Sequence, residues 1–144
     1  MQVHHILKSK ATDAVVTVKS GTSISDVAKI LTEKRIGTVV VSNDDETALG
    51  ILSERDIVRE LANRGASCLS EPAESYMTSQ LVTCQRHDDA DDILAKMTEG
   101  RFRHVPVVED GKLVGLITIG DVVKARLTEL AMERNALEGM IMGH

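Results

Sequence analysis

The sequence predicts an α+β fold built from two tandem copies of one β-α-β-β-α unit, followed by an extended C-terminal helix. Residues 15–44 align with residues 81–110 at an offset of 66, and residues 50–56 align with residues 115–121 at an offset of 65. Within both copies, short β-branched runs alternate with apolar residues at helical spacing. Because one copy of such a repeat usually cannot bury its apolar face alone, we expect the two copies to pack against each other.

Each copy begins with a strand and a helix. Residues 15–18 and 81–83 are β-branched runs that predict short strands. Apolar residues then recur at helical spacing. The residues that do so are Ile24, Val27, Ala28 and Leu31 in the first copy and Ile93, Leu94 and Met97 in the second.

A hairpin and a second helix complete each copy. Residues 38–41 and 104–108 predict strands that lead through a turn into another apolar strand. Asp110-Gly111 is a strong signal for a tight hairpin, because both residues tolerate positive φ. The helix between the first two strands makes them parallel, and the hairpin makes the last two antiparallel, which predicts a small mixed sheet with helices on one face.

These patterns divide the chain into four segments. We expect the first repeat with an N-terminal lead-in at 1–64, a linker at 65–75, the second repeat at 76–127 and a helical extension at 128–144. An apolar stripe on the last helix needs a partner, which is either a second copy of the chain or its own repeat. The stripe consists of Val123, Leu127, Leu130, Leu137 and Ile141.

Composition excludes several classes of function. The 144 residues carry a net charge of −5 and only two aromatic side chains, Tyr76 and Phe102, which argues against a nucleic-acid surface. The sequence predicts neither a membrane span nor a signal peptide, so we expect a cytoplasmic protein. Cys68 and Cys84 lack a disulfide pattern and are expected to be reduced thiols.

One short motif occurs at the same place in both copies. A hydroxyl residue precedes an Asp by three positions at a predicted strand-to-helix junction, as Ser53 with Asp56 and as Thr118 with Asp121. The simplest interpretation is helix capping. The same geometry suits a nucleotide, because a helix start holds phosphate and a carboxylate accepts from both ribose hydroxyls.

The ordered set of motifs resembles a tandem cystathionine-β-synthase (CBS) domain pair, or Bateman module. The resemblance covers residues 6–126 and rests on Gly-Ile-Leu-Ser-Glu-Arg-Asp in one copy and on Arg-His-Val-Pro-Val-Val with Gly-Leu-Ile-Thr-Ile-Gly-Asp in the other. It implies a regulatory module that binds adenosyl ligands in clefts between the repeats. Those ligands are AMP, ADP or ATP and, in some members, NAD or S-adenosylmethionine.

The resemblance also implies the residues of two sites. One site would use Thr118, Gly120 and Asp121 with an adenine wall from Val16, Ile36, Gly37 and Thr38, and the other would use Ser53, Arg55 and Asp56 with Thr78, Val82, Phe102 and Arg103. Arg103 and His104 match positions that often supply cations to phosphates in the family. Gly120 replaces Arg55 and Thr38 replaces His104 between the copies, so we expect unequal affinities.

We therefore expect a regulatory homodimer that is not an enzyme, has no metal or catalytic cofactor and signals to an unknown protein partner. The acidic run Asp88, Asp89, Asp91 and Asp92 is expected to cap a helix, with a cation site as the alternative. Two other functions stay open. One is a dimeric scaffold that binds no ligand, and a weaker one is an enzyme acting on a nucleotide, for which the sequence offers no general-base constellation.

Overall fold

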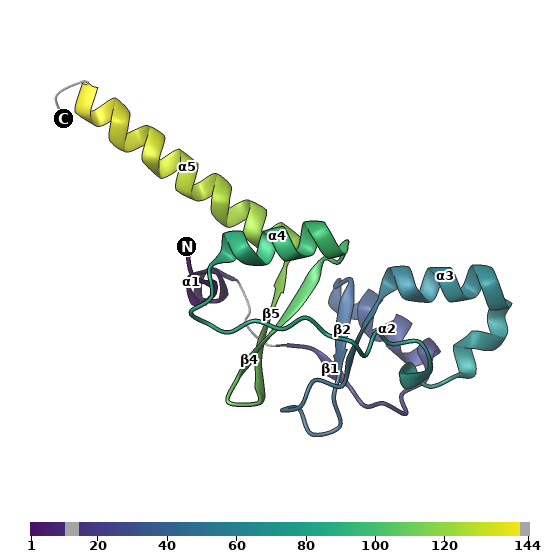
Figure 1. The fold of residues 1–144 in the computed structure, drawn as a ribbon. Helices are drawn as coiled ribbons and strands as arrows, with labels where there is room; N and C mark the ends of the chain where they lie inside the picture. The colour runs from purple at the N-terminus through teal and green to yellow at the C-terminus, as the bar shows by residue number, and fades with distance from the viewer. Residues whose placement is uncertain (11–14, 142–144) are drawn as a thin grey trace.

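The first repeat has the predicted β-α-β-β-α order. In the computed structural model, which describes residues 1–10 and 15–141, β1 pairs in parallel with β2, and β2 pairs antiparallel with β3. Helices α2 and α3 lie on one side of this sheet (Figure 1). The elements are β1 (Thr17–Val18), α2 (Ile24–Lys34), β2 (Thr38–Val41), β3 (Gly50–Ser53) and α3 (Glu54–Arg64).

The second repeat keeps the helix, hairpin and helix of the first. It consists of α4 (Ala90–Gly100), β4 (His104–Glu109), β5 (Lys112–Thr118) and α5 (Ile119–Ile141). Asp110 and Gly111 join β4 to β5 with φ angles of 50° and 78°, which confirms the predicted tight turn. The α+β fold with two repeats and a long C-terminal helix is therefore confirmed.

The strand predicted at residues 81–83 is wrong. In its place, Cys84 forms a single parallel bridge to Val107 in β4. The Cys84 N–H donates to the Pro106 carbonyl at 3.0 Å, and the Cys84 carbonyl accepts from the Val108 N–H at 2.8 Å. Val82 is exposed, so the β-branched run there has no core face to bury.

The segment that precedes each repeat packs on the other repeat. Helix α1 (Val3–Ser9) places Val3 and Ile6 in the core of the second repeat. Backbone bonds fix this contact, with the Val3 N–H donating to the Asp88 carbonyl at 2.9 Å. In the first repeat, Ala73 near the end of the expected linker enters the core in the same way. The lead-in at the start of the chain therefore packs on the second repeat.

Two glycines at equivalent positions allow these crossing segments to approach. A Cβ on Gly50 of β3 would lie 2.5 Å from the Met77 sulfur, and a Cβ on Gly115 of β5 would lie 2.8 Å from the Leu7 side chain. Either contact is too close for a real side chain. Gly50 and Gly115 therefore occupy equivalent positions because the same packing contact occurs in both repeats.

The region expected as a linker contains two 3₁₀ helices, η1 (Gly65–Ser70) and η2 (Ala73–Ser75). Cys68 and Ala73 within it are buried, so this region packs on the first repeat. Residues 11–14 of the expected lead-in and residues 142–144 of the expected extension lie outside the described residues.

Asp89 caps α4 as the sequence predicts. Its side chain accepts from the Asp91 N–H at 2.9 Å, while the Asp88 carboxylate accepts from the Gln85 N–H at 2.8 Å. In the residues that the structure describes, no group of three or more His, Cys, Asp or Glu side chains is arranged to hold a metal ion. Helix capping accounts for Asp89, turn formation accounts for Asp88, and Asp91 and Asp92 lie in the first turn of α4.

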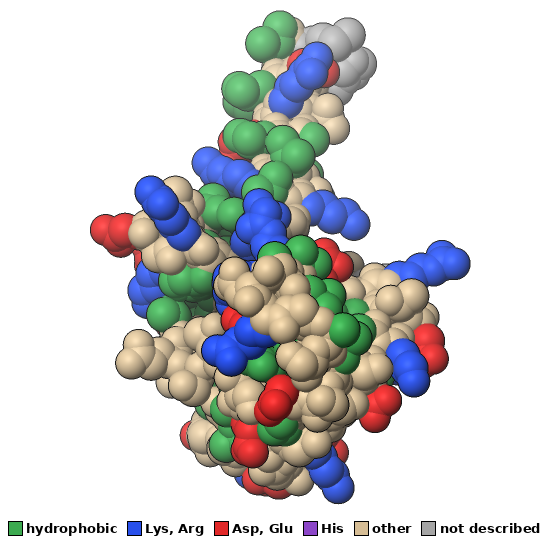
Figure 2. Space-filling model, turned by 90° about the vertical axis from the view of Figure 1, so that its right-hand side faces the viewer, with side chains coloured by type: hydrophobic (Ala, Val, Ile, Leu, Met, Phe, Trp, Pro, Cys, Tyr) green, Lys and Arg blue, Asp and Glu red, His purple; other side chains and the backbone are tan. Residues whose placement is uncertain are grey.

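Helix α5 projects beyond the body of the molecule (Figure 1). Hydrophobic side chains lie along the projecting part, as the space-filling view shows (Figure 2). Leu127, Leu137 and Ile141 are 62%, 59% and 83% exposed. None of the helices in the described ranges, α5 included, combines the length and the apolar character that a bilayer crossing requires.

Candidate functional site

The junction between β5 and α5 forms the first half of the site. The Asp121 N–H donates to Thr118 Oγ1 at 3.0 Å, and Asp121 Oδ2 accepts from the Thr118 N–H at 2.9 Å. These reciprocal bonds cap the helix because Asp stands three residues after the hydroxyl. The capping interpretation of the motif is therefore confirmed here, and the Asp121 carboxylate is held at the helix start.

Lys10 completes this junction from the other end of the chain. Its ammonium donates to Asp121 Oδ2 and to the Leu116 carbonyl, both at 2.9 Å. The Lys10 and Asp121 side chains are only 24% and 21% exposed, so solvent screens this ion pair less than a surface pair. The N-terminal segment thereby brings a cation to the carboxylate of the second repeat.

A cavity of about 310 Å³ lies beside this ion pair, between the two repeats. The first repeat contributes residues that precede and begin β2, and the second contributes the ends of β4 and β5. The lining residues are Leu7, Lys10, Val15, Val16, Ile36, Gly37, Thr38, His104, Leu116 and Thr118. The structure thus brings together five of the seven residues expected for one site, and Asp121 bonds to two residues of the lining.

His104 belongs to this cavity, although the sequence placed it beside the other cleft. Its Nδ1 lies 3.4 Å from the hydroxyl of Thr38, the equivalent residue of the first repeat. Burial lowers the pKa of His104 below its usual 6.5, and the positive charges of Arg103 and Lys10 lower it further. The negative charges of Asp121 and Asp56 raise this pKa and offset part of the decrease. A largely neutral imidazole therefore lines the cavity at neutral pH.

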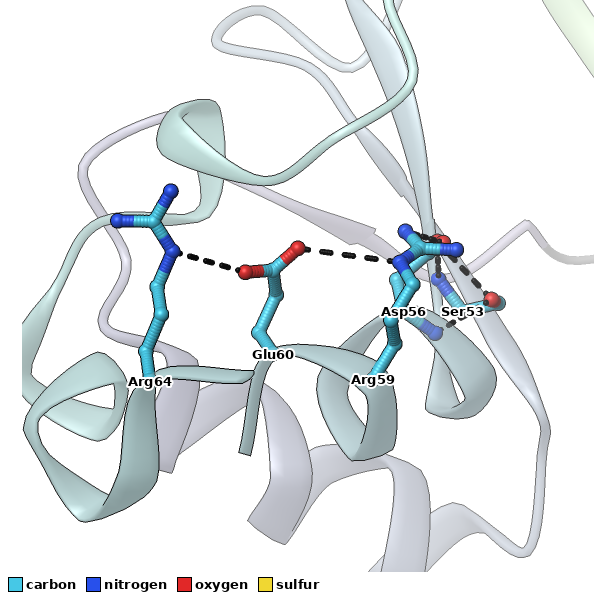
Figure 3. Close-up of polar contacts among 5 residues, drawn as sticks. All are labelled: Ser53, Asp56, Arg59, Glu60 and Arg64. Carbon is cyan, nitrogen blue, oxygen red and sulfur yellow. Dashed lines mark hydrogen bonds and ion pairs between the residues drawn. The ribbon is translucent and has the colours of Figure 1, made fainter. Parts of the chain in front are cut away.

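The junction between β3 and α3 repeats the capping geometry with a different cation (Figure 3). Asp56 Oδ2 accepts from the N–H and the hydroxyl of Ser53, both at 2.9 Å. Asp56 Oδ1 accepts from Arg59 at 2.8 Å, and Arg59 and Arg64 flank Glu60 along the helix (Figure 3). Asp56 is thus paired within its own helix, whereas Asp121 is paired with Lys10.

The other residues expected at the second cleft lie around this junction without converging on one described cavity. Thr78 is exposed and pairs with Ile51, two residues before Ser53, through backbone bonds of 2.8 and 3.0 Å. Phe102 is half-buried against the core of the second repeat. Arg55, Val82, Arg103 and, at the first site, Gly120 are exposed. Their binding roles stay predictions.

Sequence reasoning missed Lys10, Leu7 and Leu116 as residues of the cavity. The repeat alignment begins at Val15, so Lys10 had no equivalent that could draw attention to it. Its contact with Asp121 spans 111 positions and depends on α1 crossing to the second repeat. No sequence signal marks Lys10, because the lead-in contains other polar residues such as Lys8 and Ser9.

The thiols are structural in the residues described. Cys68 and Cys84 are both buried and free of disulfide bonds. Burial, with the nearby charge of Asp88, raises the pKa of Cys84 to about 12, so this thiol is protonated and unreactive at neutral pH.

Comparison with solved structures identifies the fold. The CBS-domain containing protein ATU1752 from Agrobacterium tumefaciens is 45% identical, with a TM-score of 0.83 over 88% of this chain and 99% of that chain. The CBS domain protein PAE2072 from Pyrobaculum aerophilum, complexed with AMP, is 30% identical, with a TM-score of 0.78 over 92% and 99% of the two chains.

A third structure holds other adenosyl ligands. The CBS domain pair of protein MJ0100, in complex with 5′-methylthioadenosine and S-adenosyl-L-methionine, is 26% identical, with a TM-score of 0.78 over 90% of this chain and 98% of that chain. The family model of the CBS domain matches residues 5–63 and 73–128. With two matched regions that follow the two repeats of the structure, the chain belongs to the CBS domain family as a tandem pair.

Proposed function

We propose that the chain is a regulatory sensor that binds an adenosine-containing nucleotide between its two repeats and signals to a protein partner through a change of conformation. The observation that carries this proposal is the cavity of about 310 Å³ lined by both repeats, with the Thr118 and Asp121 capping box at its edge. The proposed role requires no catalytic residue.

The residues of the cavity fit the parts of an adenosine ligand. Its apolar wall, with Val16, Ile36 and Leu116, suits the face of a purine ring. Asp121 suits ribose, because a carboxylate has about four acceptor positions and the described residues use two of them. The volume lies at the low end of the roughly 300–1,000 Å³ of small-molecule pockets, which favours a mononucleotide over a dinucleotide.

The AMP, 5′-methylthioadenosine and S-adenosylmethionine that neighbouring structures hold support an adenosyl ligand for this chain. A ligand that touches both repeats and α1 would favour the arrangement in which all three are close. Such a ligand changes the conformation only through its different affinities for two states.

We further propose a cytoplasmic homodimer in which α5 pairs with α5 of a second copy. Val123, Leu127, Leu130, Leu137 and Ile141 are exposed at spacings of three, four and seven residues, which is the stripe of a two-stranded coiled coil. In an antiparallel pair with Leu127 facing the partner copy's Leu137, Lys124 would lie opposite Glu138 at both ends. Glu138 pairs with Arg134 of its own helix at 3.1 Å, so Lys124 of a second copy would add to an existing ion pair, and the proposed dimer rests on the apolar stripe.

The same exposed stripe supports the alternative function, a dimeric scaffold without a ligand. The two functions differ in whether the Asp side chains at the starts of α3 and α5 bind a small molecule. In the scaffold, Asp56 and Asp121 would serve only as helix caps.

Calorimetric titration with AMP tests the sensor against the scaffold. We expect two classes of site in the unmodified protein, with Asp121→Asn weakening one and Asp56→Asn the other by about tenfold or more, because a hydrogen bond to a charged group is lost. Asn keeps one carbonyl oxygen as an acceptor for the N–H of Thr118 or Ser53, which preserves the cap. Unchanged titrations of both variants would refute the proposed site.

A further inference from the structure

Lys10 is the charged group that the N-terminal segment brings to the cavity. Its ammonium is fixed by two bonds of 2.9 Å, to Asp121 Oδ2 and to the Leu116 carbonyl, and its side chain forms part of the cavity wall. An ammonium has three donors, and the described residues take two of them. A cation held in place by protein partners loses little conformational freedom when a ligand arrives.

In the described residues, the helix that begins at this cavity contributes no cation to the cavity lining. Gly120 stands in the first turn of α5, where α3 has Arg55. The counterpart of Arg59 in α5 is Lys124, which is also basic but is exposed on the helix and is not part of the described cavity lining, and Asp121 bonds to Lys10 instead. His104 adds no full positive charge at neutral pH, since its pKa is lowered.

We propose, on the basis of the proposed function, that Lys10 makes this cavity select an adenosine ligand with a phosphate group over a neutral or sulfonium-bearing one. The ribose hydroxyls can bond to Asp121 Oδ1, since both bonds that the described residues make to this carboxylate fall on Oδ2, and the third donor of the Lys10 ammonium then serves the 5′ substituent. A phosphate then accepts a charge-assisted hydrogen bond from Lys10, whereas a sulfonium is repelled by it.

The charges around the cavity agree with this assignment. The charged groups that shift the pKa of His104 are Arg103, Lys10, Asp121 and Asp56. Asp56 is paired with Arg59 and Asp121 is turned to the capping box, so the carboxylates are compensated. Lys10 is the cation among them that also lines the cavity.

The test compares AMP with adenosine, which has the same base and ribose without the phosphate. Titration calorimetry is carried out on the full chain and on Lys10→Met, which keeps the length of the side chain and removes its charge. Lys8→Met is the matched control, because Lys8 is exposed, belongs to the same segment and carries the same charge. Lys10→Arg keeps the charge, and thermal unfolding establishes that each variant is folded.

We expect Lys10→Met to lower the affinity for AMP by about tenfold or more, since the bond to the charged phosphate is lost. The affinity for adenosine should stay within about twofold, because adenosine has no phosphate. Lys8→Met should change neither the affinity for AMP nor that for adenosine, and Lys10→Arg should keep the preference for AMP. The unmodified protein should bind AMP more tightly than S-adenosylmethionine.

If Lys10→Met lowers the affinities for AMP and adenosine equally, the proposed selection of phosphate is overturned, and Lys10 is then a positioning residue for Asp121. Unchanged AMP binding by Lys10→Met would overturn it as well. Both results leave the proposed function standing. If the unmodified protein binds neither AMP nor adenosine, the proposed function itself fails, so the two failures are distinguishable.

Discussion

Thr38 and His104 are equivalent residues of the two repeats, and they meet where the repeats join. Thr38 begins β2 and is buried, while His104 begins β4 and lines the cavity between the repeats. The Thr38 hydroxyl and His104 Nδ1 are 3.4 Å apart. A duplicated position therefore supplies a small hydroxyl from one repeat and a titratable ring from the other to the same cavity.

His104 should make the stability of the protein depend on pH. Because burial and the charges of Arg103 and Lys10 lower its folded-state pKa, the unfolded chain takes up the proton at a higher pH than the folded chain. The free energy of unfolding should therefore be fully retained above the ordinary value of 6.5 and fall as the pH drops below it.

Thermal unfolding at pH 7.5 and pH 5.5, conditions chosen on either side of the histidine range, measures this effect. We expect the drop in Tm from pH 7.5 to pH 5.5 to be smaller in His104→Gln than in the unmodified protein. In His87→Gln, where the residue is exposed, the drop should equal that of the unmodified protein. Equal losses in His104→Gln and the unmodified protein would contradict the effect.

At the level of single residues, sequence predicted the capping pairs but not their cations. Ser53 with Asp56 and Thr118 with Asp121 follow a local rule, because hydroxyl and acid lie one helical turn apart. Arg59 lies within reach of Asp56 on the same helix and could have been inferred from its spacing. The role of Lys10 could not be inferred from spacing, since its contact with Asp121 requires the tertiary fold.

Helices and hairpins were predictable as elements because their signals are local. The apolar spacing of α2 and α4 and the Asp110-Gly111 turn all depend on neighbouring residues. The strand expected at residues 81–83 failed because a short β-branched run forms a strand only with a partner, and here the ladder reaches Cys84 alone. The 3₁₀ helices of residues 65–75 have no apolar period to reveal them.

Helix α5 should set the oligomeric state. We expect the protein to be a dimer, and we expect Leu130→Glu combined with Leu137→Glu to convert it to a monomer, because four carboxylates would enter the apolar seam of the pair. Thr128→Glu combined with Asn135→Glu adds the same charge to α5 away from the stripe and should leave the dimer intact.

Sedimentation or light scattering measures the mass of each variant. A monomeric unmodified protein would contradict the α5 pair, and so would a dimer that persists with Glu at positions 130 and 137. Neither result affects the cavity, which lies within one chain.

In the whole molecule, the crossing of α1 and of η2 ties the two repeats together. Val3 and Ile6 are buried in the second repeat, and Ala73 is buried in the first. Lys10 follows α1 directly and therefore reaches Asp121 at the cavity between the repeats. The duplication was evident in the sequence, but this exchange of segments was not, because the lead-in carries no repeat of its own.

Binding in that cavity would couple both repeats and the N-terminal segment to one ligand. The central claim is therefore that an adenosyl nucleotide stabilises the folded chain through this cleft. Thermal unfolding with AMP, ADP, ATP, NAD and S-adenosylmethionine in turn tests it most directly, with the Asp56→Asn and Asp121→Asn double variant as the control.

A ligand present at about 100 times its Kd adds roughly 2.7 kcal/mol to the free energy of unfolding, which raises Tm by several degrees in a chain of this size. We predict such a shift with AMP in the unmodified protein and a much smaller shift in the double variant. An unchanged Tm with all five compounds at millimolar concentration would contradict the account and favour the scaffold.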